Sequence, residues 1–399
     1  MGLGYKFNRL ELAGSLGDLG TLLPLGIGMV IINGLSPSGL FLSIGVFYIL
    51  SGLYYGITSP VQPMKVIGAY AVAMALSSSQ IAASGLLVAV FLLIIGGTGA
   101  ITLIGKYVPK SVVRGIQMST GALLMSQGVK FVLGTSEYQI LQKVAEPYFH
   151  IQNIGPIPIG IIIGAIAGIA TLVFLNNKRF PAGLIVLSGG LICGLILGTH
   201  AGFSEMKVGI HLPDILPFGF PTGADFSFAL IILVLPQLPM TLGNAVIANA
   251  DLSEQYFGVD SKKVTYKALC FSMSLANFFT FFVGGMPLCH GAGGLAAHYR
   301  FGARTAGSNL MIGIIFLALA LFLGRHALTI VNLIPFSVLG VLLVFAGGQL
   351  ALTIIDIKER NDLFVGFVML GITLASNLAV GFGVGILLAY ALKSEKINI

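Results

Sequence analysis

Charged residues are scarce in this sequence. Asp, Glu, Lys and Arg make up 9% of the 399 residues, tryptophan is absent, and apolar residues make up 56%. A soluble domain carries about 25% charged residues, because its surface must face water. So few charged side chains cannot form the polar surface that a folded protein needs in water, whereas a protein in lipid exposes an apolar surface. The composition therefore predicts a membrane protein with several spans, and the 54 glycines suit close helix packing.

Cysteine is scarce as well. Cys193, Cys270 and Cys289 lie far apart, with no CxxC pair and no metal-ligand spacing. This pattern argues against a disulfide framework and a zinc site, so no metal and no cofactor are expected. The net charge of +7 does not point to nucleic acid, because the basic residues lie in short connections between apolar runs.

Apolar runs predict the crossings. A span of hydrocarbon needs roughly 20 apolar residues, and about twelve runs approach that length. Two shorter segments, near 64–78 and 291–299, each follow a proline-containing stretch. Counting both predicts fourteen transmembrane segments in an all-α polytopic protein. With both termini in the cytoplasm, most of the 21 Lys and Arg residues fall in cytoplasmic connections, among them a loop holding His298, Arg300 and Arg304.

The two halves of the chain repeat. The segments 15–18 (SLGD) and 241–244 (TLGN) lie at nearly the same offset as Pro60 and Pro287. This predicts a seven-plus-seven repeat, and since seven is odd, the halves are inverted across the membrane, as in many transporters. Residues 1–200 form the first repeat, 201–224 a connecting loop and 225–399 the second repeat. No appended soluble regulatory domain is expected.

The third and tenth segments are predicted to be broken. Prolines bias the preceding residue toward extended chain and suit the first turn of a helix. Each stretch therefore predicts extended chain entering a half-helix whose N-terminus lies at mid-membrane. Such a terminus has up to four unpaired N–H groups and a partial positive charge, so two of them meeting predict an anion site.

The candidate substrate-binding residues belong to these segments and to a polar stripe of the eighth span: Gln62, Met64, Lys65, Gln237, Thr241, Asn244, His290, Gly291, Ala292 and Gly293. For two of these residues, the sequence leaves more than one role open. Lys65 contacts the ligand, snorkels, or pairs with Asp18 as a structural bridge. His290 is a donor, a proton relay or a satisfied interior histidine.

Asp18 is a carboxylate inside a span, where a charge costs about 2.5–3.5 kcal/mol. A structural or proton-coupling role is favoured for it, because a carboxylate repels an anion. His290 is the second candidate for coupling or structure.

Several motifs resemble the molybdate transporter family, a branch related to the sulfate permeases. They are GDLGT at 17–21, PVQPMK at 60–65, LPQLP at 235–239 with GNA at 243–245, and PLCHGAGG at 287–294 continuing to HYRFGAR at 298–304. The resemblance covers most of the chain. It implies the seven-transmembrane inverted-repeat fold shared by sulfate and nucleobase permeases, with core and gate domains, and it implies oxyanion uptake and a homodimer.

The sequence thus predicts a secondary active transporter that takes up molybdate, or next sulfate, by alternating access. Moving a charge against the membrane potential costs about 2.3 kcal/mol per 100 mV, so a coupled proton or other ion is expected.

Two alternatives remain. A nucleobase permease of the same fold would use carboxylates in the eighth and tenth crossings, and none occurs between Phe226 and Ala250 or between Gly284 and Arg304. An intramembrane enzyme would need a nucleophile–base pair, but Cys289 and His290 are adjacent and no HExxH motif occurs.

Overall fold

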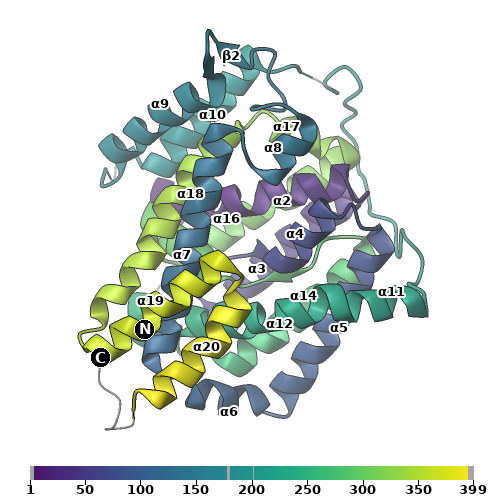
Figure 1. Cartoon of the computed structure of the whole chain (residues 1–399). Helices are drawn as coiled ribbons and strands as arrows, with labels where there is room; N and C mark the ends of the chain where they lie inside the picture. The colour runs from purple at the N-terminus through teal and green to yellow at the C-terminus, as the bar shows by residue number, and fades with distance from the viewer. Residues whose placement is uncertain (1–3, 178–179, 201, 394–399) are drawn as a thin grey trace.

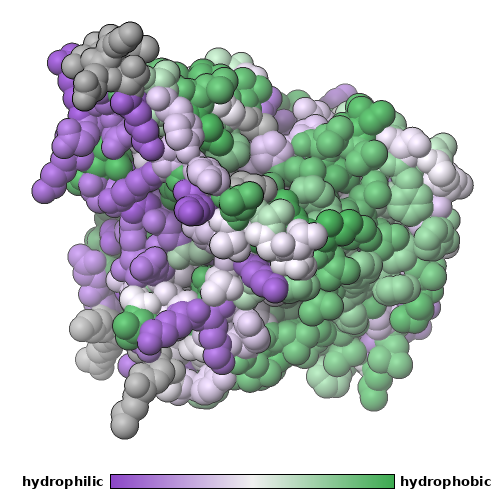
Figure 2. All heavy atoms as spheres, turned by 90° about the horizontal axis from the view of Figure 1, so that it is seen from below, coloured by the Kyte–Doolittle hydropathy of each residue, from purple (hydrophilic) through white to green (hydrophobic). Residues whose placement is uncertain are grey.

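The computed structural model describes residues 4–177, 180–200 and 202–393 and consists almost entirely of helices (Figure 1). Lys178, Arg179 and Lys396, expected in cytoplasmic connections, lie outside the described residues. Within the described ranges, six helices are long and apolar enough to cross a membrane, or seven if the bent pair Arg9–Leu23 and Leu25–Ile31 is one span. A broad apolar face covers one side of the molecule (Figure 2). The prediction of a multi-pass membrane protein is confirmed.

The regular helix of the first span is interrupted at Gly17 and Asp18, ahead of the bend between Leu23 and Leu25. Helix α1 (Arg9–Leu16) begins after Asn8, whose side chain accepts from the N–H groups of Leu10 and Glu11 at 3.0 Å. Helix α2 (Leu19–Ile31) follows, with Asp18 at its N-cap position. The break places the Asp18 carboxylate in the protein interior, where it is 1% exposed.

Two short strands pair at the centre of the molecule, although they are far apart in sequence. Strand β1 (Gln62–Pro63) runs antiparallel to β4 (Leu288–Cys289), and the N–H of Met64 donates to the carbonyl of Pro287 at 2.9 Å. Each strand leads into a short helix, α4 (Lys65–Ala73) or α15 (Ala292–Phe301). These short helices lie where the two short segments are predicted, and each follows extended chain. That they are half-helices starting at mid-membrane stays a prediction.

The longer helices form two groups (Figure 1). In the first bundle, α3 (Pro37–Tyr55) packs on α16 (Ala306–Ala318), and α5 (Ser78–Gly97) packs on α14 (Tyr266–Val283). The second bundle contains α7, α9, α10, α18, α19 and α20. Their bounds are α7 (Lys110–Leu133), α9 (Ile159–Phe174), α10 (Ala182–Leu197), α18 (Phe336–Ala351), α19 (Arg360–Ala375) and α20 (Leu378–Ala391).

Small residues bring α7 and α18 together. A Cβ atom added to Gly121 would lie 2.5 Å from the carbonyl oxygen of Gly347, and one added to Gly340 would lie 2.5 Å from that of Gly128. This register makes the two helices antiparallel. Backbones approach this closely only where side chains are absent, which is how membrane helices gain packing energy in lipid.

The eighth predicted span is a single long helical segment with two π-helical turns. It consists of α11 (Gly223–Phe228), η1 (Ala229–Val234), α12 (Leu235–Met240), η2 (Thr241–Ala248) and α13 (Asn249–Phe257). Proline at 236 and 239 removes two backbone donors here, which weakens the regular α-helical pattern. Wide π turns often accompany functional sites, and this segment packs against both α4 and α7.

The remaining elements are short. They are α6 (Ala100–Tyr107), α8 (Glu137–Gln142), β2 (Asn153–Ile154), β3 (Ile157–Pro158), η3 (Gly258–Ser261), η4 (Leu319–Leu323), η5 (Gly324–His326), α17 (Ala327–Val331) and η6 (Leu352–Asp356). The connection that contains α8 also holds Glu146. Its carboxylate accepts from the N–H groups of Phe336 and Ser337, both at 2.9 Å, and so caps the start of α18.

Candidate functional site

The start of α15 carries unpaired backbone donors. Gly291 is the N-cap residue and has no side chain to satisfy the first turn. Among the hydrogen bonds of the described residues, none engages the N–H groups of Ala292 or Gly293. A Cβ added to Gly293 would lie 2.6 Å from Leu124 of α7 and 3.8 Å from Leu350 of α18. The uncapped terminus therefore lies against α7 and α18 of the second bundle.

The start of α4 is different, because a side chain caps it. Gln237 Oε1 accepts from the N–H groups of Val66 and Ile67 at 3.0 and 3.3 Å, and its Nε2 donates to Thr241 Oγ1 at 3.0 Å. Gln237 is 1% exposed. Two predicted ligands, Gln237 and Thr241, thus form a polar chain that ties the eighth span to α4 and leaves fewer free donors there.

A second polar chain links the start of α4 to the start of α2. Gln62 Nε2 donates to Asp18 Oδ1 at 2.6 Å, and Lys65 Nζ donates to Gln62 Oε1 at 3.1 Å. Gln62 is fully buried and Lys65 is half-buried. Lys65 and Asp18 form no direct ion pair among the described residues, since Gln62 stands between them. The sequence placed these three residues near the site but did not predict the bridging role of Gln62.

Glycines let the first turn of α15 approach this chain. A Cβ on Gly291 would overlap Gln62 Oε1 and would lie 3.3 Å from Asn244 Nδ2. A Cβ on Gly294 would overlap Asp18 Oδ2 and would lie 2.6 Å from Pro60 Cβ. Gln62 Oε1 therefore lies between Lys65 Nζ and the start of α15, and the lysine charge is close to the unpaired donors.

The other predicted residues lie around this centre. Met64 is the N-cap residue of α4 and is buried, and Ala292 is fully buried in the first turn of α15. Asn244 approaches Gly291 from η2, and within the described residues its Oδ1 atom has no hydrogen-bond partner. These positions line the same meeting point of α4, α15 and η2.

His290 is not part of that cluster. Its Nδ1 lies 2.7 Å from the Pro60 carbonyl, its Nε2 lies 2.9 Å from Ser272 Oγ, and its ring packs on Phe47 at 4.5 Å between centroids. A carbonyl accepts only, so Nδ1 donates and Nε2 accepts from the serine hydroxyl. This arrangement satisfies a neutral ring and favours the reading of His290 as an interior histidine.

The prediction of a loop at 298–304 is wrong in part. His298 and Arg300 belong to α15, which continues to Phe301 and ends only at Gly302, where φ is +119°. His298 is fully buried, with Nδ1 at 2.7 Å from Thr58 Oγ1. The glycine, which adopts a left-handed conformation easily, sets the end of the helix.

Two asparagines that the sequence analysis did not select hold the extended segments. Asn277 donates to the Leu288 carbonyl at 2.8 Å and accepts from its N–H at 2.9 Å. Asn309 makes the same pair of contacts with Ser59, at 2.7 and 2.9 Å. Asn277 thus pairs with the backbone of β4, and Asn309 pairs with the extended chain that leads to β1. The signal was available, since both are polar residues inside apolar helices.

A family profile described as "Molybdate transporter of MFS superfamily" matches residues 10–124 and 229–350, which include Asp18, Gln62, Lys65, Gln237 and the glycines of α15. The chain belongs to this molybdate transporter family. Molybdate transporter 2 of Arabidopsis thaliana is 32% identical over 424 residues, covering 97% of this chain and 88% of the plant protein. Molybdate transporter 1 of the same plant is 28% identical, with the same coverage of each chain. The resemblance predicted from the motifs is thus confirmed.

Solved structures share the fold of this family member. SLC26A9 matches with a TM-score of 0.59 and 15% identity over 98% of this chain, which spans 66% of the SLC26A9 chain. The transmembrane domain of BicA, a cyanobacterial bicarbonate transporter, matches with a TM-score of 0.53 and 16% identity, covering 98% and 99% of the two chains. The relatives are transporters and not enzymes, which agrees with the prediction that this protein is a membrane transporter.

Proposed function

We propose that this protein is a secondary active transporter that takes up a tetrahedral oxyanion, molybdate first and sulfate second. The uncapped start of α15, with Lys65 beside it, is the observation that carries the proposal. Three curated relatives are named molybdate transporters, and a more distant one, 22% identical, is the putative sulfate transporter YvdB of Bacillus subtilis. Unpaired N–H groups at a helix start bind tetrahedral oxyanions directly, and no acidic or basic side chain is needed for this.

The proposed ligands are the N–H groups of Ala292 and Gly293, the Lys65 ammonium group and the Asn244 amide. Lys65 is linked to this region through Gln62 Oε1, which its Nζ contacts and which the start of α15 approaches at Gly291. Gln62 keeps Lys65 and Asp18 apart, so the lysine charge is not neutralised by a direct ion pair. Gln237 and Thr241 have positioning roles, because their polar atoms hold α4 in place.

The fold is proposed to be an inverted repeat of fourteen segments, with residues 1–200 and 225–399 as the two halves and 201–224 between them. The proposal is supported by packed helix pairs that remain packed pairs when each helix is replaced by its counterpart in the other half. The repeat matches α3 with α14, α5 with α16, α7 with α18, α9 with α19 and α10 with α20. Under this match, a packed pair in one position predicts a second packed pair. The pair α3–α16 predicts α14–α5, α7–α19 predicts α18–α9, and α9–α10 predicts α19–α20. Each of these pairs is present.

In the proposed mechanism, the first bundle forms the core domain together with α4, α15 and the eighth span, which hold the anion. The second bundle is the gate domain. Movement of one against the other exposes the site to each side in turn. Both chain ends are proposed to be cytoplasmic, and a homodimer is proposed from the family resemblance. Uptake of a dianion against an inside-negative potential requires a coupled proton or other ion. Asp18 is the favoured proton carrier, since it reaches Lys65 through one side chain.

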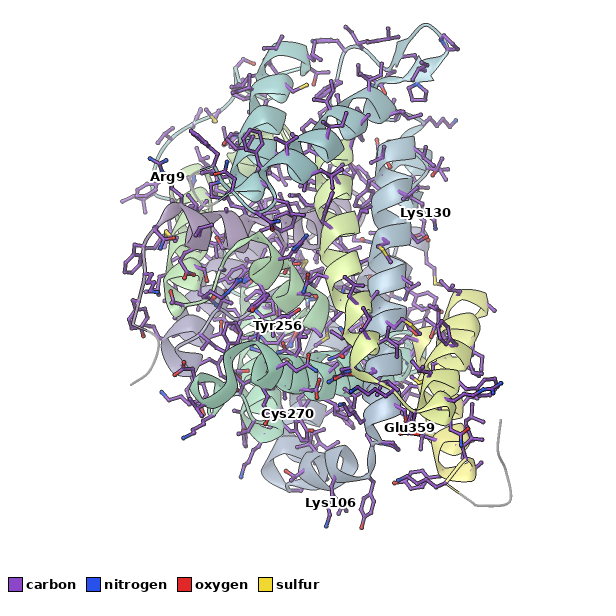
Figure 3. The ribbon with its side chains drawn as sticks, turned by 90° about the vertical axis from the view of Figure 1, so that its left-hand side faces the viewer. Arg9, Lys106, Lys130, Tyr256, Cys270 and Glu359 are labelled. Carbon is purple, nitrogen blue, oxygen red and sulfur yellow. The ribbon has the colours of Figure 1, made fainter. Side chains whose placement is uncertain are left out.

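Replacing Lys65 with alanine tests the site. We expect the Kd for molybdate to rise at least about tenfold, because a charge-assisted contact is lost. Lys130→Ala is the matched control, since Lys130 is exposed on α7, away from the half-helices (Figure 3). Calorimetry on the purified protein gives both values. Unchanged affinity in the Lys65 variant would rule out its contact with the anion.

Replacing Asp18 with asparagine tests the coupling. We expect the pH dependence of molybdate uptake into proteoliposomes to disappear while binding at fixed pH remains, because asparagine keeps an acceptor for Gln62 but carries no proton to transfer. Asp214→Asn changes an exposed aspartate of the connecting loop in the same way and should leave the profile intact. If Asp18→Asn retains the wild-type pH profile, Asp18 is not the proton carrier.

A further inference from the structure

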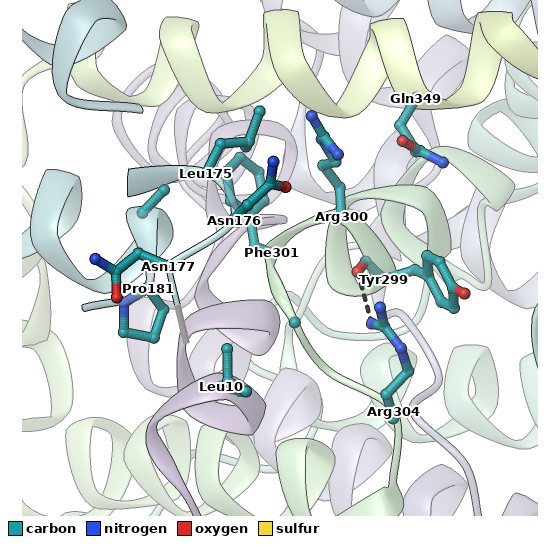
Figure 4. Close-up of a pocket in the computed structure, with 12 residues that line it drawn as sticks. Leu10, Leu175, Asn176, Asn177, Pro181, Tyr299, Arg300, Phe301, Arg304 and Gln349 are labelled. Carbon is teal, nitrogen blue, oxygen red and sulfur yellow. Dashed lines mark hydrogen bonds between the residues drawn. The ribbon is translucent and has the colours of Figure 1, made fainter. Parts of the chain in front are cut away.

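A cavity of about 500 Å³ opens at the far end of α15, away from the half-helix start (Figure 4). It lies among α1, the end of α9, the start of α10, α15 and α18. Its polar lining includes Asn176, Tyr299, Arg300, Arg304 and Gln349. None of the described residues that line it is an aspartate or a glutamate. The charged side chains among these lining residues are therefore both basic, and the cavity has room for a hydrated oxyanion.

Arg304 has a structural task in this cavity. Its Nη1 donates to the carbonyls of Tyr299 and Ala303 at 2.6 and 2.7 Å, and its guanidinium group lies 3.6 Å from the centre of the Tyr299 ring. Its backbone N–H donates to Glu11 Oε2 at 3.0 Å. A cation on the last carbonyls of a helix offsets the negative end of the helix dipole. Arg304 thus offsets the negative end of the α15 dipole, which would otherwise repel an anion from the cavity.

Arg300 has no such task. Among the described residues the ion pairs join Lys110 and Arg114 to Asp251 and Asp356, and none involves Arg300. Its side chain extends toward α18, with Asn176 on one side and Gln349 on the other (Figure 4). A half-buried guanidinium group with amide groups around it and no carboxylate partner suits an anion, which it can bind through two parallel N–H donors.

The positive end of another helix faces the same cavity. Helix α10 has sixteen residues and begins at Ala182 after Pro181, and both residues line the cavity. Pro181 supplies no side-chain cap for the first turn. Backbone donors and a partial positive charge therefore add to the charge of Arg300.

The cavity lies one helix length from the proposed transport site. Eight residues separate Ala292 from Arg300 along α15, which corresponds to about 12 Å at 1.5 Å per residue. One helix thus has oxyanion donors at its start and a cavity with two basic side chains at its end. An anion that leaves the first site on this side would meet Arg300 next.

We propose that Arg300 forms a second oxyanion site on the cytoplasmic side of the transport site, where the anion binds after it leaves the transport site. This inference rests on the proposed function, because it assigns the same class of anion to both sites. Asn176 and Gln349 supply neutral donors around the bound anion, and Arg304 positions the end of α15. The second site binds more weakly and with a stronger salt dependence, since it is open to solvent.

The test is the number of molybdate ions bound per chain, measured by equilibrium dialysis with radiolabelled molybdate. The protein is held in a maltoside detergent, which has no phosphate group to compete. The wild type is expected to approach two ions per chain at low salt, and Arg300→Gln to saturate at one with the tighter affinity unchanged. Lys65→Ala is expected to lose the tighter ion and keep the weaker one. Arg360→Gln is the matched control and should still bind two, because Arg360 is exposed at the start of α19 and does not line the cavity.

The outcomes separate this inference from the proposed function. A wild-type protein that saturates at one ion, or an Arg300→Gln variant that still binds two, overturns the second site and leaves the transport site standing. A wild-type protein that binds no oxyanion overturns the proposed function itself. Arg300→Lys, which keeps the charge, is expected to retain the second ion with at least about tenfold weaker affinity, because the two-donor geometry is lost. Equal thermal melting of the variants shows that each is folded.

Discussion

Replacing Gly294 with alanine is expected to reduce molybdate uptake about a hundredfold while the protein still folds. The added methyl group would overlap Asp18 Oδ2 and lie 2.6 Å from Pro60 Cβ and 2.9 Å from Gln62 Nε2. Relieving the overlap separates the half-helices or breaks the bond between Gln62 and Asp18. Overpacking of this kind costs about 1–3 kcal/mol, and about 1.4 kcal/mol corresponds to tenfold in rate.

The control for this variant is Gly168→Ala on α9, where the added methyl group would have no atom within 4 Å. Uptake of radiolabelled molybdate into proteoliposomes compares the two, and thermal melting in detergent shows whether the fold is kept. The expected result is a large loss for the Gly294 variant and wild-type uptake for the control. Equal uptake by both variants would contradict the close contact between α15 and Asp18.

The double variant Asp251→Asn/Asp356→Asn is expected to lose about 3–5 kcal/mol of stability, because it leaves a buried guanidinium group without its counter-charges. Arg114 on α7 is 2% exposed. Its Nε and Nη2 donate to Asp356 of η6 at 2.8 and 2.7 Å, and its Nη1 donates to Asp251 of α13. The cluster thus joins α7 of the second bundle to the end of the eighth span.

The measurement is the melting temperature and the yield of monodisperse protein in detergent. Lys110→Gln is the control, since Lys110 reaches Asp356 at 3.3 Å but is 59% exposed, and exposed pairs contribute about 0–1 kcal/mol. We expect a small change for the control and a large one for the double variant. A double variant that melts with the wild type would show that this cluster does not hold the eighth span to the second bundle.

The short helices α4 and α15 could be predicted because their signals are local. Prolines at 60, 63 and 287 and the glycines after His290 fix extended chain followed by a helix start, whatever the rest of the chain does. The structure places these helices at Lys65–Ala73 and Ala292–Phe301, within a few residues of the expected ranges. Lys65 and Gln62 were selected for the same reason, since they lie at the start of the first of these helices.

The roles of Gln237 and His290 could not be predicted in this way. Gln237 caps α4 only because the eighth span packs beside it, and a single sequence does not state which helices are neighbours. His290 was expected beside the anion because it precedes the start of α15, but its ring turns toward Phe47 and Ser272. The direction of a side chain in extended backbone changes with every residue, so a shift of one position moves it to the opposite face.

The central claim is that the meeting point of α4 and α15 is an oxyanion site, and ligand binding to the purified protein tests it most directly. Calorimetry would compare molybdate, tungstate, sulfate and uracil under one set of conditions. The account predicts that molybdate and tungstate bind more tightly than sulfate, that Lys65→Ala weakens all three, and that uracil gives no signal. Tight binding of uracil with no response to any oxyanion would contradict the account and leave only the fold.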